Sequence, residues 1–200
     1  MGNWWTQCFT IKKEKGKMYK VSDEGAFVEV SLVSPIPAIS LKLDHQNLKV
    51  RNKIKKALGI GVPTVQSITK YRHLSLCWIS NDELLLLSEG KEVDVILKKI
   101  RKEFVSIHSL VEEVTDIRAW FLLEGEKAID LLRKGVPIDF SKFDLSSKSF
   151  FRSRLGEIQV NILVESKRRI IISVLRSVEE YACQWLKQCS KQGSEINFDL

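Results

Sequence analysis

The chain has 200 residues, of which 44% are hydrophobic, with only four prolines and ten glycines. This length suits one large domain or two small ones, and the composition excludes a disordered or fibrous protein. The net charge is +7, but the basic residues are spread along the chain rather than gathered in one aromatic-interleaved patch. We therefore favour a basic surface facing solvent or acidic subunits, and we expect no nucleic-acid partner.

Cysteine, histidine and hydropathy patterns limit the class further. The four cysteines and three isolated histidines show no spacing typical of a metal site, so we expect no metal ligands on this chain. No apolar stretch reaches the length of a membrane span, and the first residues lack a signal-peptide pattern. The sequence thus predicts a cytoplasmic protein with free thiols and no membrane partner.

Residues 1–33 are expected to form an N-terminal arm with one short strand near 26–32. Trp4 and Trp5 are large aromatic side chains with little local core to join. They either anchor the arm in an interface with another chain or fold back onto this protein's own core. The sequence leaves both alternatives open.

Residues 34–116 predict a first α+β half. Its expected elements are a strand at 39–43, a helix at 50–58, strands at 73–79 and 83–87, a helix at 92–104 and a strand at 105–114. The first helix runs into Gly59-Ile60-Gly61-Val62-Pro63. This segment lacks the third glycine and the preceding strand of a dinucleotide-binding loop, so we interpret it as a helix stop.

Residues 117–190 predict a second half, followed by a polar tail at 191–200. Its expected elements are a strand at 117–123, a short helix near 128–132, a hairpin of 150–155 and 158–165, a strand at 170–175 and a helix at 177–189. Gly135 is expected to end the short helix in the left-handed conformation. Ser177 and Glu180 are expected to form a capping box at the start of the last helix.

The two halves share a sequence echo. Lys56–Pro63 parallels Asp130–Pro137, with Gly135-Val136-Pro137 matching Gly61-Val62-Pro63. The pattern predicts an α+β fold of two similar β-α-β-β-α halves, each a split, ferredoxin-like arrangement of helices on an antiparallel-rich sheet.

The sequence shows no nucleophile–base signature, phosphate loop or usable pair of carboxylates, so we expect no catalytic and no cofactor-binding residues on this chain. Arg152 and Arg154 share one face of a strand. They could hold a carboxylate or phosphate, face solvent, or meet acids across an interface. The candidates for contact with a partner are Trp4, Trp5, Trp120, Arg152 and Arg154.

Several of these segments together resemble one family. In the second half they are Leu132–Phe140, Arg152–Gly156 and the helix carrying Ser177, Tyr181 and Trp185; in the first half they are Ala57–Pro63 and Leu76–Leu86. Their ordered set, from about residue 34 to 189, resembles the gamma subunit family of heterotetrameric sarcosine oxidase.

The resemblance implies a non-catalytic subunit in an assembly that oxidatively demethylates sarcosine. Such assemblies produce glycine and hydrogen peroxide and pass the methyl carbon to tetrahydrofolate. The alpha and beta subunits hold NAD, FAD and FMN, and the small delta subunit holds zinc. The gamma subunit is similar to the folate-binding fold of the glycine cleavage T-protein and carries no cofactor.

Two other classes remain as alternatives. A stand-alone folate- or small-molecule-binding protein of the T-protein type would use Arg152 or Arg154 to hold a folate carboxylate. A nucleic-acid module would suit the split sheets and the charge of +7, but the aromatic sheet signature of RNA-binding domains is missing.

Overall fold

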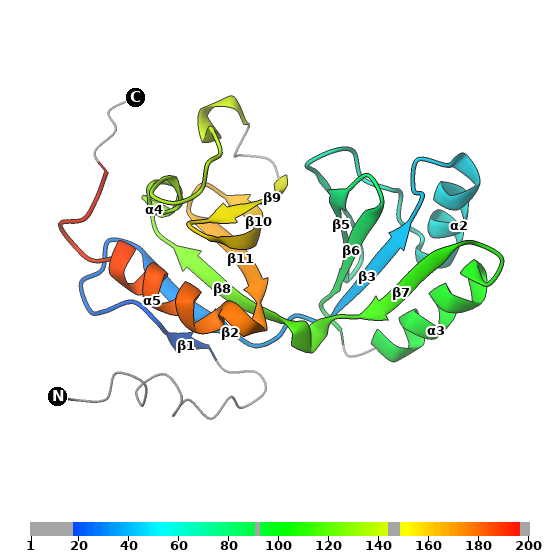
Figure 1. Cartoon of the computed structure of the whole chain (residues 1–200), viewed down its shortest axis with the longest axis horizontal. Helices are drawn as coiled ribbons and strands as arrows, with labels where there is room; N and C mark the ends of the chain where they lie inside the picture. Colours follow the sequence, from blue (N-terminus) through cyan, green and yellow to red (C-terminus); the bar gives the residue numbers. More distant parts are fainter. Residues whose placement is uncertain (1–17, 91–92, 144–148, 197–200) are drawn as a thin grey trace. The chain divides into compact units, whose positions relative to one another are not determined.

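The structure, a computed structural model, describes residues 18–90, 93–143 and 149–196. The chain divides into two compact units (Figure 1). The first unit contains Ile36–Ile117 and the first residues of strand β9, and the second contains the rest of the described chain. Trp4 and Trp5 lie outside the described residues.

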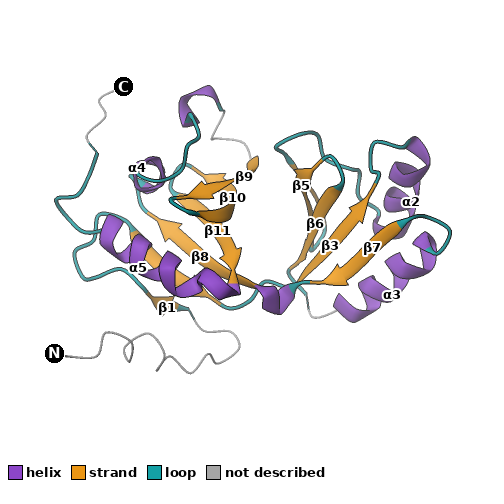
Figure 2. Ribbon diagram, in the orientation of Figure 1, coloured by secondary structure: helices purple, strands orange, loops and turns teal. Residues whose placement is uncertain are grey.

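The first unit is a five-stranded antiparallel sheet with two helices on one face (Figure 2). Its elements are β3 (Ala38–Leu43), α2 (Leu48–Leu58), β4 (Ile68–Tyr71), β5 (Leu74–Ser80), β6 (Glu83–Ser88), α3 (Val93–Phe104) and β7 (Ser109–Glu113). The strand order is β4-β5-β6-β3-β7. All the elements expected in this half are present, and β4 is an additional edge strand.

The core of the first unit is built by helical and alternating spacing. Ile54 of α2 and Ile100 of α3 are fully buried against strand residues such as Leu41, Leu76 and Leu84. The helix α2 begins at an asparagine cap and ends at Gly59, which has φ 71° and donates its N–H to the Lys55 carbonyl at 2.8 Å. The interpretation of this segment as a helix stop is therefore confirmed.

The second unit is a six-stranded sheet of order β1-β2-β8-β11-β10-β9, with helices α4 and α5. Its elements are β1 (Tyr19–Lys20), β2 (Glu29–Val33), β8 (Arg118–Glu124), α4 (Ala128–Arg133), β9 (Ser149–Leu155), β10 (Ile158–Ser166), β11 (Arg169–Leu175) and α5 (Glu179–Cys189). Short 3-10 turns lie at Thr115–Ile117, Phe140–Lys142 and Arg176–Val178. The expected hairpin is present as β9 and β10, which turn through Gly156 at φ 57°.

The two sheets have the same strand order once β2 is counted in the second. The order β4-β5-β6-β3-β7 in the first unit corresponds to β9-β10-β11-β8-β2 in the second. The strand β2 comes from the N-terminal segment and takes the place that β7 holds in the first sheet. It pairs antiparallel with β8, with Val30 opposite Leu123 and Leu32 opposite Phe121. The described part of the expected arm thus contributes two strands, β1 and β2, to this sheet, and Val30 and Leu32 of β2 are buried there.

Two local expectations in the second half are wrong. The helix α4 has a right-handed C-cap at Lys134, and Gly135 does not adopt a positive φ. The helix α5 begins at Glu179 without a side-chain cap, because Ser177 lies inside the preceding 3-10 turn. Glu180 instead accepts a hydrogen bond from Gln184 Nε2 at 2.8 Å.

Candidate functional site

Three segments of the second unit meet at two glycines. Gly156 in the β9–β10 turn donates its N–H to the carbonyl of Gly135, which follows α4, at 2.9 Å. A Cβ on Gly135 would lie 2.4 Å from Trp185 Cζ2, and a Cβ on Gly156 would lie 2.7 Å from Tyr181 Oη. Both aromatic residues belong to α5. Glycine is therefore required at both positions for α5 to approach the turn and the end of α4.

A pocket of about 410 Å³ opens beside this glycine junction. Its walls come from the end of α4 and the β9–β10 turn, and its lining residues are Arg133, Lys134, Gly135, Val136, Pro137, Arg154, Gly156 and Glu157. Three of these side chains are basic and one is acidic, so the lining carries net positive charge.

The two arginines of the pocket are only partly engaged. Arg133 Nη1 contacts Asp130 Oδ1 at 2.9 Å, and Arg154 Nη2 contacts Glu157 Oε2 at 3.0 Å. Each contact uses one guanidinium nitrogen, whereas a guanidinium has five N–H donors. The Arg154–Glu157 pair is exposed, and ion pairs of that kind contribute about 0–1 kcal/mol, whereas the Arg133–Asp130 pair is part-buried. Arg154 can therefore exchange its partner for an incoming anion, and Arg133 can share its remaining N–H donors with one while it keeps Asp130.

Lys134 has a structural role instead. Its Nζ donates to the Cys189 carbonyl at 2.6 Å and to Ser194 Oγ at 2.8 Å. The same Nζ lies 4.8 Å from the centroid of the Phe27 ring. Because these contacts occupy the ammonium group, Lys134 holds the segment after α5 and the N-terminal segment in place. Burial raises the pKa of the adjacent Cys189 thiol, and the charge of Lys134 opposes that shift.

The structure separates the five candidate contact residues that the sequence indicated. Arg154 lines the pocket, and Arg152 is exposed but lies outside the pocket lining. Trp120 is only 1% exposed, so the prediction that it contacts a partner is wrong. Its ring is buried because both faces of β8 are covered, as the burial of all of Ala119–Leu123 shows. Trp4 and Trp5 lie outside the described residues.

Sequence reasoning missed Arg133, Tyr181 and Trp185 as site residues. All three belong to the motifs that carry the family resemblance, so the signal was present in the sequence. It did not indicate that the end of α4, the hairpin turn and α5 converge.

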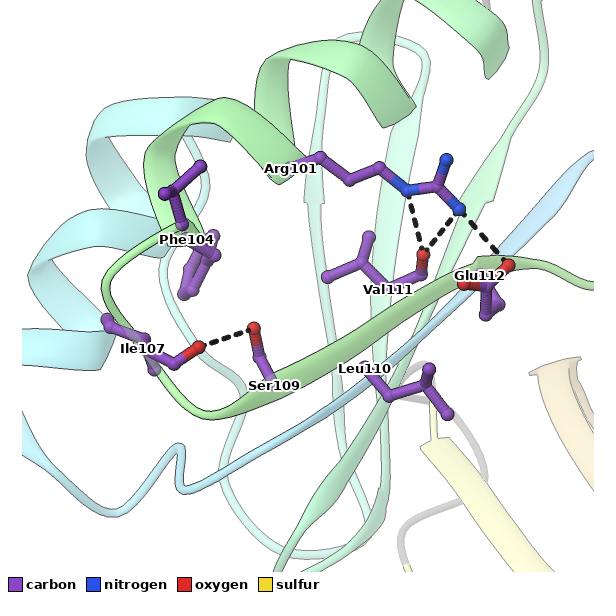
Figure 3. Close-up of a pocket in the computed structure, with 8 residues that line it drawn as sticks. Arg101, Phe104, Ile107, Ser109, Leu110, Val111 and Glu112 are labelled. Carbon is purple, nitrogen blue, oxygen red and sulfur yellow. Dashed lines mark hydrogen bonds and ion pairs between the residues drawn. The ribbon is translucent and has the colours of Figure 1, made fainter.

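A second pocket, of about 270 Å³, lies beside the edge strand β7 (Figure 3). Arg101 of α3 donates from Nε and Nη2 to the Val111 carbonyl at 3.1 and 2.9 Å, and Nη2 also reaches Glu112 Oε2 at 3.1 Å. Val114 donates its N–H to the Ala38 carbonyl on the neighbouring strand β3. In an antiparallel pair every second residue directs its backbone N–H and C=O to the partner strand, so Val111, three residues earlier, directs these groups away from β3, to the free edge of the sheet. Arg101 therefore caps this edge, a common protection against strand addition, and we interpret the pocket as structural.

Two further observations concern metal ligands and thiol groups in the described part of the chain. Among them, no group of three or more His, Cys, Asp or Glu side chains is placed to hold a metal ion. The Cys77 thiol is fully buried, and this burial strongly raises its pKa, so it remains protonated and unreactive. No helix within the described ranges is long and apolar enough to cross a membrane.

The fold, two α+β units with antiparallel sheets of equivalent strand order, defines a structural class with solved members. A chain in the structure of heterotetrameric sarcosine oxidase from Corynebacterium sp. U-96, in complex with pyrrole 2-carboxylate, is 20% identical, with a TM-score of 0.76 over 89% of this chain and 91% of that chain. Glycine cleavage system aminomethyltransferase T from Bartonella henselae is 12% identical, with a TM-score of 0.56 over 80% of this chain and 45% of that chain. These likenesses confirm the expected fold class.

The family follows from the sequence itself. Residues 44–192 match the model of the sarcosine oxidase, gamma subunit family, and this match spans most of the chain. The chain therefore belongs to the sarcosine oxidase gamma subunit family, as the resemblance of its motifs predicted. A search of curated proteins found no match.

Proposed function

We propose that this chain is the gamma subunit of a heterotetrameric sarcosine oxidase and acts through assembly rather than through reactive groups of its own. The observation that carries the proposal is the family match over residues 44–192. The likeness in fold to a chain of the Corynebacterium enzyme over almost the full length of both chains supports it.

The proposal includes the reaction of the assembly and its partners. Sarcosine would be oxidatively demethylated to glycine in the cytoplasm, with hydrogen peroxide as a product and the methyl carbon passed to tetrahydrofolate. FAD, FMN, NAD and zinc would be held by the alpha, beta and delta subunits. The contribution of this chain would be to fix the arrangement of those subunits.

The surface around the glycine junction suits such a role. Arg154 has an exposed side chain, and Tyr181 of α5 is 40% exposed. Arginine and tyrosine are enriched at protein–protein interfaces and supply much of their binding energy. An obligate interface buries about 2,000 Å² or more, so this surface would form one part of a larger contact.

Co-expression with candidate alpha, beta and delta subunits, followed by size-exclusion chromatography, tests the proposal. We expect this chain to elute with the flavin absorbance of the complex. Elution of this chain by itself, apart from a flavoprotein assembled from the other three subunits, would contradict it.

A stand-alone folate-binding protein is a second candidate, which the partly engaged arginines of the pocket and the fold likeness to aminomethyltransferase T favour. A ligand that binds only the folded protein raises its unfolding temperature. At a ligand concentration of a hundred times the dissociation constant, the free energy of unfolding rises by about 2.7 kcal/mol. Tetrahydrofolate should then stabilise the isolated wild-type chain but not an Arg154→Gln variant. No shift for the wild-type chain excludes this candidate.

A further inference from the structure

We infer that the pocket beside the glycine junction receives a carboxylate side chain from a partner subunit, with Arg133 and Arg154 as the residues that bind it. This inference rests on the proposed function and names the chemistry of one contact in the assembly. The partner segment is acidic, because aspartate and glutamate are the anions that an unmodified protein surface presents.

The charges of the pocket favour an anion. Its lining includes Arg133 and Arg154 against the single acid Glu157, and the ammonium group of Lys134, held by the Cys189 carbonyl, adds positive charge from behind. Asp130 and Glu157 each engage only one guanidinium nitrogen, so further N–H donors remain on both arginines. A planar guanidinium binds a carboxylate through two parallel N–H···O bonds, which are stronger than neutral hydrogen bonds.

The pocket is built on a fixed frame, which favours a specific contact over a diffuse basic surface. Arg133 stands two residues before Gly135, and Arg154 stands two residues before Gly156. The two glycines are joined by the backbone hydrogen bond of 2.9 Å, and α5 packs directly against both. Lys134 anchors the same segment from behind through the Cys189 carbonyl. The backbone of both arginines is therefore held in register before any partner arrives.

The nature of the lining favours a protein over a small molecule. Small-molecule sites are mostly apolar and enclose their ligand, whereas only Val136 and Pro137 are apolar here. The Arg154 side chain is 61% exposed, and the neighbouring Tyr181 is also accessible. Such groups lose their solvent only when a second surface covers them, as at the centre of a protein interface.

The test measures the affinity of this chain for the complex of the other three subunits, using wild type, Arg133→Gln, Arg154→Gln and the double variant. Truncating one partner of an interfacial charge pair should weaken binding about tenfold or more, and most strongly at low salt. Arg154→Glu should weaken binding more than Arg154→Gln, because it adds repulsion to the loss of the hydrogen bonds. The matched control is Arg168→Gln, which removes an exposed ion-paired arginine of the same unit, partnered by Glu126, outside the pocket.

The outcomes separate the inference from the proposed function. If the wild-type chain does not bind the other subunits, the proposed function fails. If wild type binds and the double variant, shown to be folded by its unfolding temperature, binds with equal affinity, the inference fails. Titration of the isolated chain with glutarate adds a third arm. Tight, arginine-dependent binding of glutarate, with no effect of the variants on assembly, would make the pocket a small-molecule site and overturn the inference.

Discussion

The two glycine–valine–proline segments of this chain look alike in sequence and serve different purposes. In the first unit Gly59 ends α2 in the left-handed conformation, and Gly61 has open space around it. In the second unit Gly135, the counterpart of Gly61, has no left-handed backbone but lies against the Trp185 ring. The repeated segment therefore ends a helix in one unit and joins three segments in the other.

The outer strands differ in the same way. The edge of β7 in the first sheet is capped by Arg101, whereas its counterpart β2 is an interior strand, covered by β1. In the second unit the strand that corresponds to β7 is β2, which comes from the N-terminal segment of the chain. A shared strand order does not imply a shared construction, and each of the following predictions tests one of these differences.

The largest effect is expected at β2. Val30 is fully buried between β1 and β8, so Val30→Asp places an unpaired charge in the second core and should cost about 3 kcal/mol or more. The exposed Val95→Asp on α3 is the matched control. Hydrogen exchange should show lost protection in β8 and β11 of the Val30 variant and retained protection in β3 and β6. Unchanged protection of β8 would contradict the place of β2 in that sheet.

The next effect compares the two glycines directly. Gly135→Ala drives a methyl group into the Trp185 ring and should destabilise the protein by about 1–3 kcal/mol, as overpacking does. Gly61→Ala meets nothing within 4 Å and should change the free energy of unfolding by less than about 0.5 kcal/mol. Urea denaturation measures both.

A double-mutant cycle identifies the cause of the Gly135 effect. In a Trp185→Ala background the cost of Gly135→Ala should largely disappear, because the clash is removed. An undiminished cost would mean that Gly135 is needed for its backbone, as the sequence had suggested.

The element types followed from local patterns, but their assembly did not. Alternating spacing indicated β3, and helical spacing indicated α2 and α3, because each of these has one clearly apolar face. The strands β5 and β6 were expected as apolar runs on either side of the turn-rich Ser80-Asn81-Asp82. The strand β4 was missed because Ile68–Tyr71 is short and half exposed, so its residues do not alternate in hydropathy. Nothing local indicates that β2 pairs with β8, since that contact joins distant parts of the sequence.

The candidate site shows the same limit. Trp120 was named as a contact candidate although its segment was expected to be a buried or half-buried strand, because the apolar run Ala119–Leu123 gives no sign of which side chains are accessible. Arg154 was identified from its strand pattern. Arg133 was not, because the segments that carry the two arginines meet only in the folded chain, through the hydrogen bond between Gly135 and Gly156 and the packing of α5 on both glycines.

A third comparison concerns asparagines. Asn161 on β10 and Ser173 on β11 are cross-strand neighbours, buried without a hydrogen-bond partner among the described residues. Asn47 in the first unit caps α2 by accepting from the Lys49 N–H at 2.9 Å.

Asn161→Leu should stabilise the protein by about 1 kcal/mol, because it removes an unsatisfied polar group. Asn47→Ala should destabilise it by about 1 kcal/mol. Destabilisation by Asn161→Leu would contradict the interpretation that the amide is unsatisfied in the folded protein.

The smallest effect on stability is expected at the capped edge. Arg101→Ala removes an exposed ion pair and should cost less than about 1 kcal/mol. It also frees the Val111 carbonyl beside the exposed Leu110, so self-association at high concentration should rise. Light scattering measures this, with the neighbouring exposed Lys102→Ala as control. Equal scattering by both variants would show that Arg101 does not protect the edge.

Native mass spectrometry of this chain co-expressed with alpha, beta and delta subunits tests the central claim most directly. The account predicts one particle that contains a single copy of this 23.0 kDa chain together with the other three. Detection of the chain only as a free monomer, beside a complete assembly of the other subunits, would contradict it.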